Sequence, residues 1–119
     1  MFKEISFTVY AVSEMPKARA FYEGVLGLKP SAEYDGSKNA NWIEYNIGST
    51  TLSVGCSPDW KPSQDGAVAA LEAIDFDACI AKLKAAGANF FMEPMGFPGC
   101  SMAVVTDPDK NRILIHRKK

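Results

Sequence analysis

The chain has 119 residues and a formal net charge of −1, and its hydrophobic fraction of 47% is that of one ordinary globular domain. Thirteen basic residues against fourteen acidic ones leave no concentrated basic surface, which argues against a nucleic-acid partner. No apolar run approaches the ~20 residues of a membrane span, and the first residues lack the pattern of a signal peptide, so we expect a cytoplasmic protein with no membrane partner.

The first half of the chain has the pattern of a strand, a helix and a run of strands. The expected elements are a strand over 5–12, a helix over 13–23, a short strand near 31–34, and strands over 42–47 and 50–55. Ser13 suits the N-cap of the helix, Pro16 its first turn and Gly27 its C-terminal end. Alternation in the fourth element puts Ile43, Tyr45 and Ile47 on one face and Trp42, Glu44 and Asn46 on the other.

The pattern restarts after a connector over 56–66, which is rich in proline, glycine and polar residues. The expected elements are a strand over 67–74, a helix over 75–86, a short strand over 89–92, and strands over 100–106 and 112–117. Asp75 suits the N-cap of this helix and Gly87 its end. The loop over 94–99 holds two prolines and two glycines and is a candidate mobile lid.

The element order is therefore βαβββ twice, a repeat of about 60 residues. We expect one domain over 1–119, with one module over about 1–57 and a second over about 66–119. In each module the helix buries one face of the sheet. Two such sheets, when joined, leave a concave cup, which is the default place for a ligand. The predicted fold class is α+β, with two βαβββ modules forming a curved mixed-sheet cup.

Two motifs, in this order and spacing, resemble those of the vicinal oxygen chelate superfamily. One is F-Y-x-x-x-L-G-L over 21–28, in the expected helix, and the other is D-P-D-x-N-R-I over 107–113, in the expected hairpin turn. The superfamily includes glyoxalase I, extradiol dioxygenases, fosfomycin resistance proteins and bleomycin-binding proteins. The resemblance covers nearly the whole chain and implies their fold and a homodimer. Lys110 stands where relatives usually carry glycine, so we expect either a strained positive φ or a different turn.

The resemblance also implies where a metal would be bound. In metal-binding members the ligands stand at positions that correspond here to Phe7, Ser53, Val68 and Leu114. A divalent metal needs imidazole, carboxylate or thiolate donors, and none of these residues supplies one. The single histidine, His116, lies two residues beyond Leu114 and shares its strand face. We therefore expect no metal site of the family's kind and no cofactor.

A few polar or aromatic residues are candidates for chemistry or ligand contact. Glu44, in an apolar cup, would have a raised pKa and act as an acid or base, or would balance a cationic ligand; the alternative is a solvated or ion-paired glutamate. Glu72 has the same two interpretations. His116 is either an inward-facing general base or an inert surface histidine. Trp42 is a candidate to stack on a ligand in the cup. The alternative is that its ring fills the cup or contacts another subunit.

Two functions compete. The first is a metal-independent protein that binds an apolar or aromatic small molecule in the cup, as the bleomycin-binding relatives do. Its expected ligand-binding residues are Phe7, Trp42, Glu44, Ser53, Val68, Met102, Leu114 and His116. The second is a glyoxalase- or dioxygenase-like enzyme, a lyase or oxidoreductase, with an unorthodox or absent metal site and with Glu44 or His116 as its acid or base. The replaced donor residues favour the first function.

Overall fold

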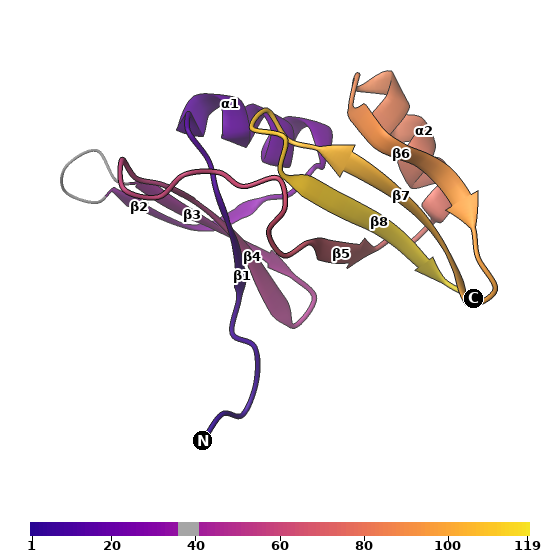
Figure 1. Ribbon diagram of the computed structural model, residues 1–119, viewed down its shortest axis with the longest axis horizontal. Coiled ribbons are helices and arrows are strands. Elements are labelled where there is room, and N and C mark those ends of the chain that lie inside the picture. Colours follow the sequence, from indigo (N-terminus) through magenta and orange to yellow (C-terminus); the bar gives the residue numbers. More distant parts are fainter. Residues whose placement is uncertain (36–40) are drawn as a thin grey trace. The chain divides into compact units, whose positions relative to one another are not determined.

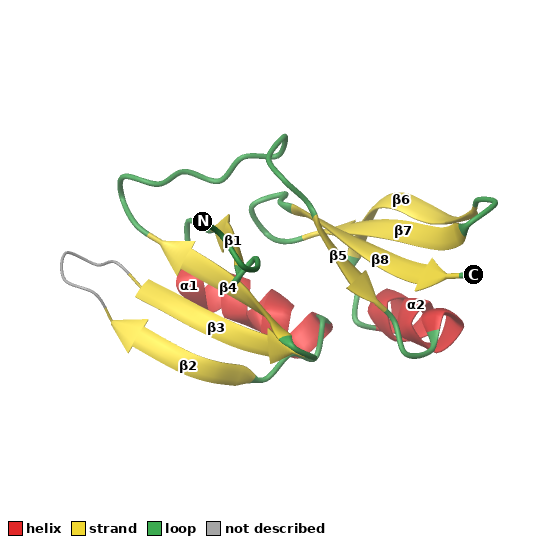
Figure 2. Ribbon diagram, turned by 90° about the horizontal axis from the view of Figure 1, so that it is seen from below, coloured by secondary structure: helices red, strands yellow, loops and turns green. Residues whose placement is uncertain are grey.

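The computed structural model describes residues 1–35 and 41–119, which form an α+β fold. The chain divides into two compact units, Met1–Ser63 and Gln64–Lys119. Each unit consists of one four-stranded mixed sheet and one helical segment (Figures 1 and 2). No helix in the described residues has the length and apolar content that crossing a membrane requires.

The first unit has one parallel and two antiparallel strand pairings. Its elements are β1 (Thr8–Ala11), α1 (Met15–Arg19), the π-helical segment η1 (Ala20–Val25), β2 (Pro30–Asp35), β3 (Asn41–Ile47) and β4 (Thr50–Cys56). The strand order is β1-β4-β3-β2, in which β1 runs parallel to β4. The pairs β2–β3 and β3–β4 are antiparallel.

The second unit repeats this topology. Its elements are β5 (Ala69–Glu72), α2 (Phe76–Ala85), β6 (Asn89–Gly96), β7 (Cys100–Thr106) and β8 (Arg112–Lys118). The strand order is β5-β8-β7-β6, again with a parallel pair, β5–β8, followed by antiparallel ones. The βαβββ repeat predicted from the sequence is confirmed.

In each unit the helical segment covers one face of the sheet. In the first, Ile43 and Tyr45 of β3 are buried together with their β4 partners Val54 and Leu52, as the alternation predicted. Tyr22 of η1 is fully buried, and its ring stacks on that of Tyr45 with centroids 6.1 Å apart. The opposite face carries the alternate residues and is not covered by the helix (Figure 2).

A charged network joins the helical segment of the first unit to its sheet. Arg19 Nε donates to Glu23 Oε2 over 2.6 Å, and the Tyr45 hydroxyl donates to the same oxygen over 2.9 Å. Arg19 also forms an ion pair with Glu33 of β2. The hydrogen bond from Arg19, with a smaller contribution from Tyr45, holds the pKa of Glu23 below its ordinary value. Burial, followed by the bond to Glu23, raises the pKa of Tyr45.

The turn between β7 and β8 is organised by a buried aspartate. Asp107 Oδ1 accepts from the backbone N–H groups of Asp109 and Asn111, over 2.9 and 2.8 Å. Its Oδ2 accepts from Asn111 Nδ2 over 2.8 Å. In the resulting loop Lys110 has a φ of 67°, so of the two expected alternatives the structure has the positive φ at a non-glycine residue.

Both predicted first strands are too long. The expected strand over 5–12 begins only at Thr8, and the one over 67–74 shrinks to β5. In the parallel register Thr8 is paired with Leu52, and β4 begins at Thr50, so Ile5 lies beyond the start of its partner and is 81% exposed. An apolar run does not reveal how far the partner strand extends.

The first half of the predicted lid loop over 94–99 is strand. Strand β6 continues through Pro94 to Gly96. A proline is tolerated within this strand because β6 lies at the edge of its sheet and its register shifts between Met92 and Met95. Phe97 N then donates to Cys100 O over 2.7 Å and closes a tight connection.

The first helical segment also differs from the prediction. Its N-cap is Glu14 rather than Ser13, and the described structure has no side-chain cap bond there. Pro16, which lacks an N–H, removes one of the donors that a cap would satisfy. Beyond Arg19 the segment widens to π geometry, with Leu26 N donating to Phe21 O over 2.9 Å. The predicted cap of the second helix is confirmed, since Asp75 Oδ1 accepts from Ala78 N over 3.0 Å.

Replacing Glu23 with glutamine is expected to lower the free energy of unfolding at pH 7 by about 1–2 kcal/mol, because the hydrogen bonds from Arg19 and Tyr45 lose their charged acceptor. The folded-state pKa of Glu23 lies below the ordinary 4.5, so its contribution is complete above about pH 5 and is lost as the pH falls below 4.5. Urea unfolding between pH 3 and 7 measures this. Glu93→Gln, which removes an exposed ion pair with Lys84, should cost less than about 0.5 kcal/mol, and equal costs for the two variants would contradict the expectation.

Replacing Lys110 with glycine is expected to stabilise the chain by about 0.5–1 kcal/mol, because glycine adopts positive φ without a Cβ clash. The matched control is Lys84→Gly in α2, which should destabilise by about 1 kcal/mol. Chemical denaturation of both variants measures whether the free energy of unfolding rises or falls in each. A destabilising Lys110→Gly would show that this backbone conformation carries no strain.

Candidate functional site

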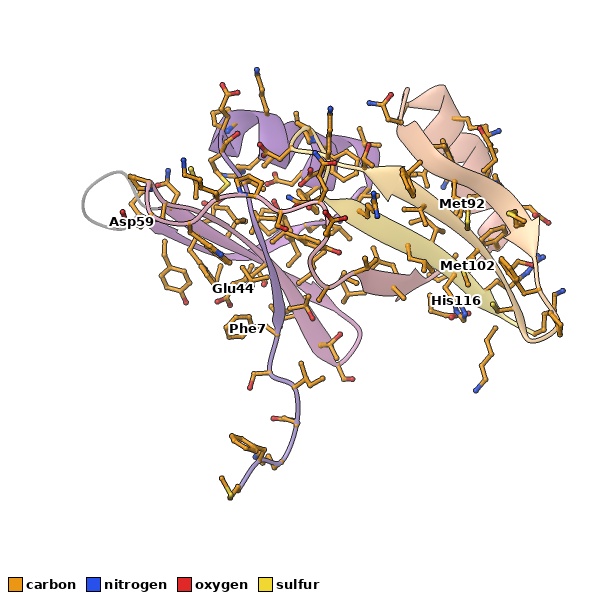
Figure 3. The ribbon with its side chains drawn as sticks, viewed as in Figure 1. Phe7, Glu44, Asp59, Met92, Met102 and His116 are labelled. Atoms are coloured by element: carbon orange, nitrogen blue, oxygen red, sulfur yellow. The ribbon has the colours of Figure 1, made fainter. Side chains whose placement is uncertain are left out.

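The open face of the first sheet gathers the aromatic and acidic candidates. Strand pairing places Glu44 opposite Ser53 and Trp42 opposite Gly55, on the face away from Ile43 and its buried neighbours. Phe7, which precedes β1, reaches the same face, where its ring meets that of Trp42 edge-on at a centroid distance of 5.5 Å. Figure 3 shows Phe7 and Glu44 on the side of the sheet away from α1.

Gly55 allows two tryptophans to lie directly on the sheet. A Cβ at Gly55 would stand 2.7 Å from the Trp60 ring and 3.1 Å from the Trp42 ring, so both rings cover its backbone. The ring of Trp60 is positioned by the short bridge in which Trp60 N donates to Ser57 O over 3.1 Å. Phe7 and Trp60 remain 46% and 38% exposed, so the aromatic surface is open to a ligand.

Glu44 is oriented by the neighbouring tryptophan. Trp42 Nε1 donates to Glu44 Oε2 over 2.9 Å, and both side chains are half-buried. The bond holds the carboxylate at the border of the aromatic surface and leaves its other oxygen able to accept a hydrogen bond. The result is an aromatic surface with one fixed negative charge, which suits an aromatic ligand that carries a donor or a positive charge.

Ser53 lies at the centre of this face. Its side chain is fully buried, and its Oγ has no hydrogen-bond partner among the described residues. Burying a hydroxyl without a partner costs free energy, and such groups in native structures call for a reason. The Ser53 hydroxyl therefore lowers the stability of the fold, unless it finds a hydrogen-bond partner in solution.

The other predicted site residues belong to the second unit. Val68 immediately precedes β5 and is exposed, whereas Leu114 and His116 of β8 and Met102 of β7 are half-buried. Pairing of Met102 with His116 places both on the open face, opposite buried Ala103 and Ile115 (Figure 3). Half of the predicted residues thus lie in each unit, and each group occupies the open face of its own sheet.

His116 is held by a carboxylate. His116 Nδ1 lies 2.6 Å from Glu72 Oε1, and the backbone N–H of Lys118 donates to Glu72 Oε2 over 2.8 Å. The hydrogen bond from His116, followed by that from Lys118, lowers the pKa of Glu72. Because a carboxylate accepts, Nδ1 carries the proton, and Nε2 is the ring nitrogen that has a lone pair in the neutral imidazole.

The four positions at which the resemblance implies metal ligands do not fit a divalent ion. Phe7 packs its ring on Trp42, Ser53 offers only a hydroxyl, and Val68 and Leu114 are aliphatic. Within residues 1–35 and 41–119 no three His, Cys, Asp or Glu side chains gather in a way that could hold a metal.

A cavity of about 520 Å³ lies on the other side of the first sheet, between α1 and the ends of β2 and β3. It is lined by Met15, Pro16, Arg19, Glu33, Tyr34, Asp35, Asn41 and Ile43, none of which the sequence suggested as a site residue. The Arg19 guanidinium in its wall already forms ion pairs with Glu23 and Glu33. It is therefore less able to bind a ligand than the groups on the open face.

Sequence reasoning singled out neither Gly55 nor Trp60 as a site residue. A glycine inside an apolar strand often marks the close approach of another group, and this signal was present at Gly55. The hydrogen bond between Trp42 and Glu44 could not be predicted from the sequence, which indicated only that the two residues share a strand face.

Comparison with known proteins identifies the scaffold. The model of one family, the Glyoxalase/Bleomycin resistance protein/Dioxygenase superfamily, matches residues 4–115. Among solved structures, TnmS3, an antibiotic binding protein from Streptomyces sp. CB03234, is 22% identical, with a TM-score of 0.81 over 99% of this chain and 98% of that chain. A glyoxalase/bleomycin resistance protein from the same organism is 23% identical, with a TM-score of 0.76 over 96% and 100%.

A glyoxalase family protein from Enterococcus faecalis is 25% identical, with a TM-score of 0.77 over 98% of each chain. No curated protein matches the chain. The similarity to these structures concerns the fold.

Replacing Ser53 with alanine is expected to raise the free energy of unfolding by about 1 kcal/mol, because the variant no longer buries an unpaired hydroxyl. The control is Ser101→Ala: Ser101 is buried as well, but its Oγ accepts from Arg117 Nη2 over 3.1 Å, so this variant should lose about 1 kcal/mol. Urea denaturation compares the two. A loss of stability in Ser53→Ala would show that its hydroxyl is satisfied in solution.

Proposed function

Because the chain belongs to the Glyoxalase/Bleomycin resistance protein/Dioxygenase superfamily, we propose that it is a metal-independent small-molecule binding protein. The ligand is aromatic or apolar, preferably with a cationic or hydrogen-bond-donating group. It lies on the open face of the first sheet, against Phe7, Trp42 and Trp60, with Glu44 as its polar contact.

One observation carries this proposal: an exposed aromatic surface adjoins a carboxylate that is already oriented. Phe7 and Trp60 are 46% and 38% exposed, and Trp42 between them fixes Glu44 through a 2.9 Å hydrogen bond. Rigid aromatic rings bind apolar area at little entropic cost, and a pre-oriented charge adds specificity.

The comparisons support the scaffold and the kind of use. One protein of similar fold is described as antibiotic binding, and another as a glyoxalase/bleomycin resistance protein. Those descriptions concern those proteins, and they support only the proposal that this fold can serve ligand binding. The lyase or dioxygenase alternative needs a divalent ion to act on vicinal oxygens, and the residues at the implied ligand positions do not supply donors for it.

Val68, Leu114 and Met102 lie on the side of the second sheet away from its buried residues, and their role as apolar ligand contacts stays a prediction from the sequence. The homodimer and the cytoplasmic location expected from the sequence remain predictions. Sedimentation velocity at micromolar concentration tests the first of them.

Proflavine, a planar aromatic cation, is a suitable probe for this face. We expect wild-type protein to bind it with micromolar affinity by isothermal titration calorimetry, and Trp42→Ala to weaken binding at least tenfold through loss of stacking area. Glu44→Gln should weaken proflavine binding several-fold, while binding of the neutral probe 2-naphthol should change little. Both tryptophans of the chain lie on this face, so quenching of intrinsic fluorescence in the wild type gives an independent readout.

The matched control is Phe91→Ala, which removes an exposed aromatic ring from the second unit, where Arg112 stacks on it at 3.9 Å. It should bind proflavine as the wild type does. Circular dichroism establishes that each variant is folded. If folded Trp42→Ala and Phe91→Ala both retain wild-type affinity, the ligand does not lie on this face.

A further inference from the structure

One row of side chains crosses the open face of the second sheet. Strand pairing aligns Met95 of β6 with Met102 of β7, Met102 with His116 of β8, and His116 with Glu72 of β5. Residues directly opposite one another on neighbouring strands point to the same face, with Cβ atoms about 4.5–5.5 Å apart. Two thioethers, an imidazole and the carboxylate that orients it therefore stand side by side, and Figure 3 shows Met102 and His116 as neighbours.

The imidazole in this row is prepared to bind a metal. Its Nδ1 is engaged by Glu72 over 2.6 Å, and Glu72 is itself held by the backbone N–H of Lys118 over 2.8 Å. A ligand histidine almost always donates its other ring N–H to a carboxylate or carbonyl, which sets the tautomer and the ring orientation. Glu72 on β5 engages Nδ1, which leaves Nε2 as the ring nitrogen for a metal, and Met102 on β7 is the neighbour of His116 on the other side.

The two methionines are placed where packing alone does not require a thioether. Met95 is 50% exposed on the edge strand, and Met102 is half-buried. The adjoining row of the same face consists of Met92, Val104 and Leu114. It also contains a methionine, but it has no imidazole beside it. Methionine has three rotatable bonds, so sulfurs on neighbouring strands can converge on one point without movement of the backbone.

We propose that Met95, Met102 and His116 form a three-coordinate site for a soft monovalent metal ion, Cu(I), on the open face of the second sheet. Thioether ligands select Cu(I), whereas divalent ions of the harder kind prefer carboxylate and carbonyl oxygen. Glu72 acts as the positioning residue of the imidazole. The site differs in residues and in donor chemistry from the divalent site that the superfamily resemblance implies, and it is independent of the aromatic face of the first unit.

A thiol is the main competitor for Cu(I), and it is close. Cys100 stands two residues before Met102 on β7, and therefore on the same face, in the row that pairs with Lys118. Cys56 and Cys79 are also free. An experiment on bulk binding would not separate thiolate from thioether ligation, so the test has to report on individual methionines.

The chain has five methionines, Met1, Met15, Met92, Met95 and Met102, and their labelled methyl groups give separate NMR signals. We expect one equivalent of Cu(I), added to the wild-type chain without oxygen and with ascorbate present, to shift the methyl signals of Met95 and Met102. Met15 in the core and Met92 in the adjoining row are internal controls that should not move. Unchanged Met95 and Met102 signals, or equal shifts at Met92, would overturn the proposal.

Affinity is measured by competition with bicinchoninate, in a background where Cys56, Cys79 and Cys100 are serine. Met102→Leu and His116→Gln should each weaken Cu(I) binding at least tenfold, because a three-ligand site loses one donor. Met92→Leu should bind as the background does. Glu72→Gln should weaken binding less than His116→Gln, since it changes only the orientation of the ring. Equal affinity of Met102→Leu and Met92→Leu would show that Cu(I) binds elsewhere on the chain.

Discussion

Each four-stranded sheet of this protein is covered by one short helical segment, and that coverage on a single face is the constraint on which the rest depends. Side chains alternate along a strand, so every strand divides its residues between a face packed under the helix and a face without that cover. In the first unit the packed face carries Ile43 and Tyr45, and Glu23 and Arg19 join helix to sheet at its border. The open face is left for other chemistry.

The parallel pairings, β1 with β4 and β5 with β8, determine which residues meet on the open faces. In the first unit this register, with that of β3, brings Ser53 and Glu44 together beside two tryptophans that lie on Gly55. In the second unit the equivalent register aligns Glu72 with His116, and His116 with Met102. The same topology therefore presents an aromatic and acidic surface in one module and a sulfur and imidazole surface in the other.

The fold of the two modules does not depend on the residues at the implied metal positions. Phe7 and Val68 stand just before the first strands of their modules, and Ser53 and Leu114 occupy equivalent places on the last strands, opposite Val9 and Ala70. Where relatives of this superfamily carry metal ligands, this chain has a ring, a hydroxyl and two aliphatic groups. Helix packing and turn chemistry, such as the Asp107 turn, maintain the fold without reference to those positions.

The sequence by itself determined the element order, the repeat and the faces. Helical and strand periodicities are local, so the buried side of β3 and the Asp75 cap could be read from neighbouring residues. The absence of donor residues at the implied metal positions was likewise a matter of residue identity. These features depend on the chemistry of a few consecutive residues and hardly on what packs against them.

Only the tertiary structure decided strand lengths, partners and geometry. Ile5 is excluded from β1 because β4 begins where it does, and Pro94 stays in β6 because that strand lies at the edge of its sheet. The bond between His116 and Glu72, 44 residues apart, and the rings over Gly55 arise from strand pairing. Such contacts join segments that are distant in the chain, and register is set by the summed burial of whole strands rather than by any one residue.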